Sequence, residues 1–114
     1  MLTSGDVVDL DLGVPQGSEA GFRHPAVVIT SQRLLTQGPP VIQVVPTTST
    51  LRDMEFEITI EPDLRNGLDR DSAAQCQHVR GVSPSRVTHV RGNVGPVVLA
   101  QVRDRIAALL DLPV

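Results

Sequence analysis

Short segments in which apolar and polar residues alternate recur along this chain of 114 residues and restrict it to a mainly β fold. In residues 54–60 every second residue is apolar, with two glutamates and a threonine at the positions between. Residues 8–12, the end of a second predicted strand over 6–12, alternate in the same way. Successive side chains of a strand point to opposite faces, so both segments are predicted to be half-buried strands. We expect the acidic side chains of both segments to face solvent: Asp9, Asp11, Glu55 and Glu57.

The remaining pattern adds more short strands and one substantial helix. Runs rich in apolar, β-branched residues predict further strands at residues 26–30 and 41–45, and two more strands are predicted at residues 73–79 and 87–91. Residues 31–35 allow a single helical turn, and after Gly95-Pro96 apolar residues recur at helical spacing through residues 95–110. Residues 1–114 are therefore expected to form one domain of mainly β structure with some α structure. Its architecture would be a small, bent antiparallel β-barrel plus a C-terminal helix.

Composition argues against several classes of protein. No stretch approaches the roughly 18 apolar residues of a membrane span and no export signal is visible, so we expect a cytoplasmic protein without membrane contact. Cys76 is the single cysteine and the three histidines lack ligand spacing, so no disulfide and no metal site is predicted. The net charge of −3 argues against a broad nucleic-acid footprint. All ten basic residues are arginines, however, and a few converging guanidiniums bind phosphate well.

A polar, glycine-rich loop runs directly into a wholly apolar strand at residues 17–30. Glu19, Arg23 and His24 lie in this loop, and Pro25 separates them from the strand. Rigid elements position the side chains of neighbouring loops, so this junction is a candidate site. By itself such a histidine is more often a structural hydrogen-bonding group, and such an arginine or glutamate a solvated charge.

Several segments, in the right order, resemble the MazF/PemK toxins, small endoribonucleases of bacterial toxin–antitoxin pairs. The resemblance covers nearly the whole chain and rests on residues 5–11, 17–28, 45–49, 72–80 and 92–94. In that family an arginine normally precedes the proline, whereas His24 stands there in this chain. Arg23 comes one residue earlier, where the family often has a histidine, so the two residue types are exchanged.

The resemblance implies an SH3-like, CcdB-like barrel and a sequence-specific endoribonuclease that needs neither metal nor cofactor. Such an enzyme cleaves single-stranded RNA (mRNA, tRNA or rRNA) when a 2′-hydroxyl attacks the adjacent phosphorus, which leaves a 2′,3′-cyclic phosphate. It also implies a homodimer that a cognate MazE-like antitoxin neutralises, with an acidic segment laid across the arginine-bearing groove.

The same resemblance supplies candidate site residues. Thr48 matches a threonine of the family's active site, where its hydroxyl would donate to a phosphoryl oxygen. We hypothesise that Arg23 stabilises phosphoryl charge and that His24 transfers a proton, because imidazoles titrate near neutral pH. The candidate substrate-binding residues are Glu19, Ser49, Gln77, His78 and Arg80. In the predicted strand, His78 can also be a core or interface histidine.

Two other functions remain open at this stage. A gyrase poison of the CcdB type would share the barrel, and the low aromatic content and acidic charge suit a protein-binding module. Against it, residues 111–114 do not match the C-terminal segment on which that activity depends. A cleavage-impaired paralogue that binds antitoxin would explain the exchange at Arg23 and His24.

Overall fold

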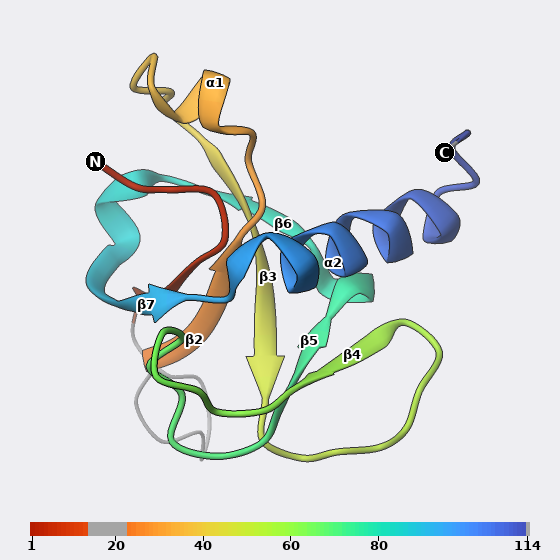
Figure 1. Cartoon of the computed structure of the whole chain (residues 1–114). Helices are drawn as coiled ribbons and strands as arrows, with labels where there is room; N and C mark the ends of the chain where they lie inside the picture. Colours follow the sequence, from red (N-terminus) through yellow and green to blue (C-terminus); the bar gives the residue numbers. More distant parts are fainter. Residues whose placement is uncertain (14–22, 114) are drawn as a thin grey trace.

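Seven strands and two α-helices make up the described part of the chain, residues 1–13 and 23–113 of the computed structural model (Figure 1). The elements in chain order are β1 (Asp6–Asp11), β2 (Arg23–Val28), α1 (Gln32–Leu35), β3 (Ile42–Thr48), β4 (Glu57–Ile60), β5 (Ser72–Gln75), β6 (Arg80–Val82), β7 (Val87–Asn93) and α2 (Gly95–Leu109). Single 3₁₀ turns follow β5 (Cys76–His78) and precede β7 (Pro84–Arg86).

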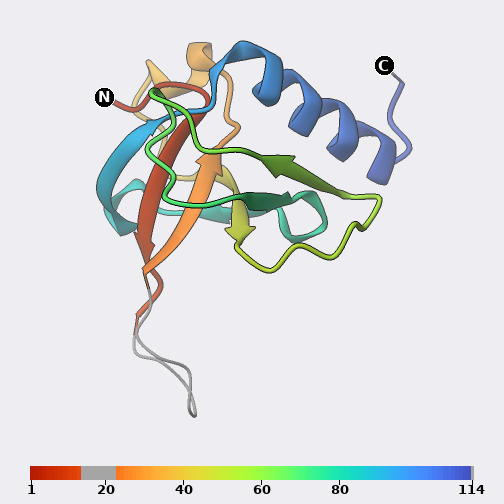
Figure 2. The same ribbon diagram turned by 60° about the horizontal axis from the view of Figure 1, so that its bottom comes forward.

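The strands form one antiparallel sheet in the order β4-β5-β3-β2-β1-β7, and β6 also pairs with β3. The long strand β3 has β2 on one side, while β6 and β5 follow one another along its other side. Figures 1 and 2 show α2 crossing the bent sheet, where it packs against β4 and the turn Cys76–His78. The predicted mainly β fold with a C-terminal helix is confirmed.

The central strands carry consecutive apolar residues at Val7-Val8, Val27-Val28 and Val44-Val45, because both of their faces are buried there. Val7, Val27 and Val45 join the core beneath α2, together with Leu99 and Val102 of that helix. Their strand neighbours, among them Val8, Val28 and Val44, pack into a second core on the opposite face, which α1 covers through Leu35. Of the two helices described, neither has the length and apolar character needed to cross a membrane.

Several predicted boundaries were wrong. The single strand predicted at 73–79 is broken, because the turn at Cys76–His78 lets the chain step from β5 to β6 along the same edge of β3. The strand predicted at 41–45 continues through Pro46 to Thr48, since extended backbone accommodates the fixed φ of proline. The strand predicted at 54–60 begins only at Glu57.

Two acidic side chains expected in solvent are buried instead. Asp9 is 6 % exposed and forms an ion pair with Arg91 of β7, 2.9 Å from Asp9 Oδ1 to Arg91 Nε. The Glu57 side chain is 2 % exposed and pairs with Arg52 of the β3–β4 loop. In both cases an arginine outside the strand supplies the compensating charge that lets a carboxylate leave water: Arg52, five residues before Glu57, and Arg91, far from Asp9 in the sequence.

Candidate active site

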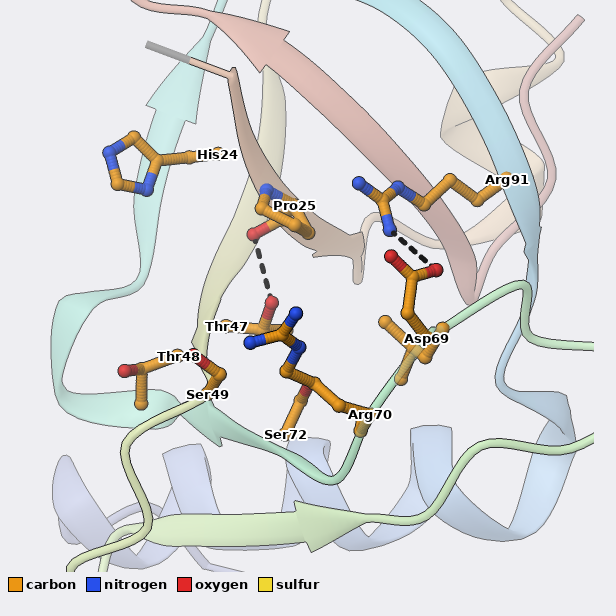
Figure 3. A pocket seen from close by; sticks show the side chains of 10 residues that line it. His24, Pro25, Thr47, Thr48, Ser49, Asp69, Arg70, Ser72 and Arg91 are labelled. Carbon is orange, nitrogen blue, oxygen red and sulfur yellow. Dashed lines mark hydrogen bonds and ion pairs between the residues drawn. The ribbon is translucent and has the colours of Figure 1, made fainter. Parts of the chain in front are cut away.

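A cavity of about 350 Å³ opens where β2 and β3 meet the loop between β4 and β5 (Figure 3). His24, Thr48 and Ser49, all candidates from the sequence, line it from the side of β2 and β3. The opposite wall comes from the β4–β5 loop, the first residue of β5, and β7: Leu68, Asp69, Arg70, Ser72 and Arg91.

The wall formed by β2 and β3 is held in place by backbone pairing and by the hydroxyl group of Thr47. Ala26 pairs with Pro46, and Thr47 Oγ1 donates a hydrogen bond to the Pro25 carbonyl oxygen at 3.2 Å, which ties β3 to the start of β2. His24 and Thr48 consequently line the same cavity although they are 24 positions apart in the sequence. Thr48 Oγ1 accepts a hydrogen bond from the Thr50 amide at 3.1 Å. Because the Thr48 oxygen is the acceptor in this bond, its O–H group remains able to donate to an oxygen of a bound ligand.

Asn66 organises the second wall. Its side chain, in a residue only 1 % exposed, donates to the Glu61 carbonyl at 2.8 Å and accepts from the amides of Asp63 (3.2 Å) and Leu68 (3.0 Å). Asp63 Oδ1 in turn accepts from the Asn66 amide at 2.7 Å. These bonds satisfy the backbone of a loop that has no ladder partner, so the loop keeps a defined shape.

Two glycines let this loop lie directly against β7. A Cβ at Gly92 would lie 2.1 Å from the Arg65 carbonyl oxygen, and one at Gly67, where φ is +67°, would lie 2.4 Å from the Arg91 carbonyl oxygen. The Asn93 amide donates to the Arg65 carbonyl at 2.8 Å across the same contact. The loop therefore brings Asp69 and Arg70 beside Arg91.

The two arginines of the cavity differ in their electrostatic surroundings. Arg91 is held between Asp9 and the Asp69 carboxylate, the latter at 3.8 Å. Arg70 is exposed, and within residues 1–13 and 23–113 its side chain has no hydrogen-bond or ion-pair partner. The cavity thus contains one largely neutralised guanidinium and one that can bind an anion.

A second cavity, of about 380 Å³, lies on the other side of His24 and Thr48, which line both. Leu10, Leu12 and Val44 give it an apolar floor, and its polar groups are Gln75, His78 and Arg80. An apolar hollow with amide, imidazole and guanidinium groups at its edge has the chemistry to hold a splayed nucleobase.

A buried carboxylate organises the neighbouring edge of the sheet. Glu57 Oε2 accepts from Arg52, from Gln77 Nε2 at 2.7 Å and from Gln75 Nε2 at 3.1 Å. The Arg52 hydrogen bond, helped by those from Gln77 and Gln75, lowers the Glu57 pKa to about 2 although burial opposes this. Gln77 is thus bound to Glu57 and lines neither of the two cavities.

The sequence-derived candidates therefore divide into three groups: those that line a cavity, Gln77, which does not, and those outside the described residues. His24, Thr48, Ser49, His78 and Arg80 line one or both cavities. His78 does so from a 3₁₀ turn rather than from the predicted strand. Glu19 lies outside the described residues. Arg23 begins β2 opposite Asp11, and its side chain also lies outside them.

Sequence reasoning missed Asp69, Arg70 and Arg91 as cavity residues. Residues 69–71 alternate in charge without forming a recognisable ligand pattern, and no local pattern connects Arg91 with this cavity. In the described part of the chain, no group of three or more histidine, cysteine or acidic residues is arranged to hold a metal ion.

Comparison with known proteins places this fold and site in context. A family model described as "PemK-like, MazF-like toxin of type II toxin-antitoxin system" matches residues 3–110. The chain is 32 % identical over 117 aligned residues to "Endoribonuclease MazF9" of Mycobacterium tuberculosis, with 98 % of both proteins covered.

Solved structures of similar fold are also found. A MazE–MazF structure from Deinococcus radiodurans (Form-II) superposes with a TM-score of 0.78 at 28 % identity, covering 96 % of each chain. A mycobacterial endoribonuclease in complex with its cognate antitoxin gives the same TM-score at 17 % identity, covering 100 % of this chain and 99 % of that one. The second likeness bears on the fold alone.

Proposed function

The chain belongs to the PemK-like, MazF-like toxins of type II toxin–antitoxin systems, and we propose that it is an endoribonuclease acting on single-stranded RNA. The observation that carries the proposal is the position of His24 and Thr48 at the junction of two cavities. One cavity contains Arg70, whose guanidinium has no ion-pair partner among the described residues and is suited to phosphate, and the other has an apolar floor suited to a base. A strand of RNA laid across the junction would place a phosphodiester beside both side chains.

The proposed reaction is an internal transesterification. His24 accepts the proton of the 2′-hydroxyl, the 2′-oxygen bonds to phosphorus, and the bond from phosphorus to the 5′-oxygen breaks. Water protonates the departing 5′-oxygen, and the resulting hydroxide takes the proton from His24, which restores the base. The products are a 2′,3′-cyclic phosphate and a 5′-hydroxyl. Thr48 donates to a non-bridging oxygen whose charge grows in the transition state. Arg23 is proposed to add a second donor, and no metal takes part.

Recognition of particular sequences is proposed to come from the second cavity. Arg80 offers donors that match base edges, and Gln75, whose Nε2 donates to Glu57, offers its amide oxygen. His78 offers a flat ring on which a base can stack. Ser49, which lines the first cavity, is proposed to contact the RNA there. Glu19 is proposed as a further RNA-binding residue. Direct readout by polar edges suits a chain with so few aromatic residues.

The proposed partners of the protein are an antitoxin and a second copy of the same chain. A cognate MazE-like antitoxin would lay an acidic segment across the first cavity and compete with RNA for Arg70. The protein is proposed to act as a homodimer, in which exposed apolar side chains such as Val97 and Leu110 would be shielded.

Incubation of the purified protein with a mixed RNA pool in EDTA, followed by mapping of new 5′ ends, tests the function. We expect discrete cuts with 5′-hydroxyl termini, and Thr48→Val should slow cutting by roughly 10²–10³-fold through loss of one donor. Thr59→Val, on the exposed face of β4, is the matched control and should cut normally.

Other outcomes point to other functions. Intact RNA together with blocked DNA supercoiling would support a gyrase poison. Intact RNA, unaffected supercoiling and tight antitoxin binding would support a cleavage-impaired paralogue. Either result contradicts the proposed endoribonuclease.

A further inference from the structure

We propose that Arg70 binds the scissile phosphate and stabilises its charge, a role that rests on the proposed RNA cleavage. The sequence places Arg70 in a charged loop between β4 and β5 and assigns it no function. The structure places it on the wall of the first cavity that faces Thr48 and His24.

Charge is the first argument. The described basic side chains of this cavity are His24, Arg70 and Arg91. Arg91 faces two carboxylates, those of Asp9 at 2.9 Å and Asp69 at 3.8 Å, so little of its charge is left for a ligand. Arg70 has no such partner within the described residues. Arg70 therefore provides the guanidinium of this cavity whose charge an incoming phosphate can neutralise.

Position is the second argument. The Arg70 carbonyl accepts a hydrogen bond from Ser72 Oγ at 3.1 Å, which fixes the backbone just before β5 begins. In β5, Ala73 pairs directly with Thr48, so the register of the sheet holds Arg70 close to the proposed catalytic threonine. In Figure 3 the guanidinium of Arg70 points into the cavity toward Thr47 and Ser49, whereas that of Arg91 points to Asp69.

Chemistry is the third argument. As the 2′-oxygen attacks, negative charge increases on the two non-bridging oxygens, and one threonine hydroxyl serves only one of them. The planar fork of a guanidinium can donate to two oxygens of one phosphate. Arg70 forms no covalent bond and moves no proton in this scheme. His24 transfers the proton, and Arg70 joins Thr48 and the proposed donor Arg23 in stabilising the negative charge on the phosphate.

The test uses the full chain and a synthetic RNA that spans a mapped cut site. Arg70→Ala should lower the single-turnover cleavage rate by roughly 10²–10³-fold, and Arg70→Lys should recover only part of it, because an ammonium lacks the fork. Arg65→Ala is the matched control: it removes an exposed arginine side chain of the same loop that lines neither cavity. It should cleave at the wild-type rate.

A sulfur substitution distinguishes phosphate binding from a structural role. Replacing one non-bridging oxygen at the cut site by sulfur should slow the wild type, and the penalty should shrink in Arg70→Ala, which has lost the donor. Thermal unfolding of both arginine variants should match the wild type. Wild-type cleavage by Arg70→Ala, an equal loss in Arg65→Ala, or an unchanged sulfur penalty would overturn the role of Arg70.

A binding measurement tests the role of Arg70 independently of whether the protein cleaves RNA. The same RNA with a 2′-deoxy nucleotide at the cut cannot react, so its affinity can be measured even if the wild type cuts nothing. Weaker binding by Arg70→Ala, with a salt dependence reduced by about one phosphate contact, supports the role even where cleavage fails. Equal affinities of Arg70→Ala and wild type would refute it.

Discussion

Replacing Asn66 by alanine should destabilise the β4–β5 loop, which carries Arg70. The Asn66 side chain makes three hydrogen bonds to the loop backbone, at 2.8, 3.0 and 3.2 Å, in a residue that is 1 % exposed. A net contribution of about 1 kcal/mol for each bond gives a loss of about 3 kcal/mol in the free energy of unfolding. For a domain of this size the midpoint of thermal unfolding should fall by roughly 12 °C.

Thermal and urea unfolding followed by circular dichroism measure this loss. Leu64→Ala is the matched control, because Leu64 is fully exposed in the same loop and its removal should leave stability unchanged. Below its melting temperature Asn66→Ala should also cleave RNA poorly, since Arg70 is no longer held beside Thr48. An unfolding midpoint equal to that of Leu64→Ala would refute the assignment of Asn66 as the organiser of this wall.

Two further predictions concern the buried carboxylates. The pKa of Glu57 is lowered from 4.5 to about 2, chiefly by the Arg52 hydrogen bond, so its ionised form adds stability that is complete above pH 4.5 and is lost as the pH falls toward 2. Urea unfolding across this range should show the loss in the wild type and a flatter profile in Glu57→Gln; parallel profiles would contradict it. Asp9→Ala leaves Arg91 without its 2.9 Å partner and should lower the free energy of unfolding by about 3 kcal/mol, which denaturant titration measures. Removal of the exposed Asp11 carboxylate should cost less than about 1 kcal/mol, and equal losses would show that the Asp9 pair does not stabilise the fold.

The candidate site was only partly visible in the sequence. His24 was found because it lies where a glycine-rich loop runs into an apolar strand, and Thr48 because it matches a threonine of the family that the segments resemble. Arg70 and Arg91 were missed because their place in the cavity depends on contacts between the β4–β5 loop and β7, more than twenty positions apart. Side-chain spacing along one segment carries no information about such a contact.

The sequence by itself determined the elements whose cause is local. Alternation predicted strands, helical spacing and Gly95-Pro96 predicted α2, and their order predicted a mainly β fold with a C-terminal helix. Only the tertiary structure decided which polar residues are buried. Asp9 and Glu57 sit at positions whose pattern indicates solvent, yet each is covered because an arginine from another element neutralises it. Burial of a charge depends on its partner in space, and that partner is set by sheet order and loop closure rather than by sequence spacing.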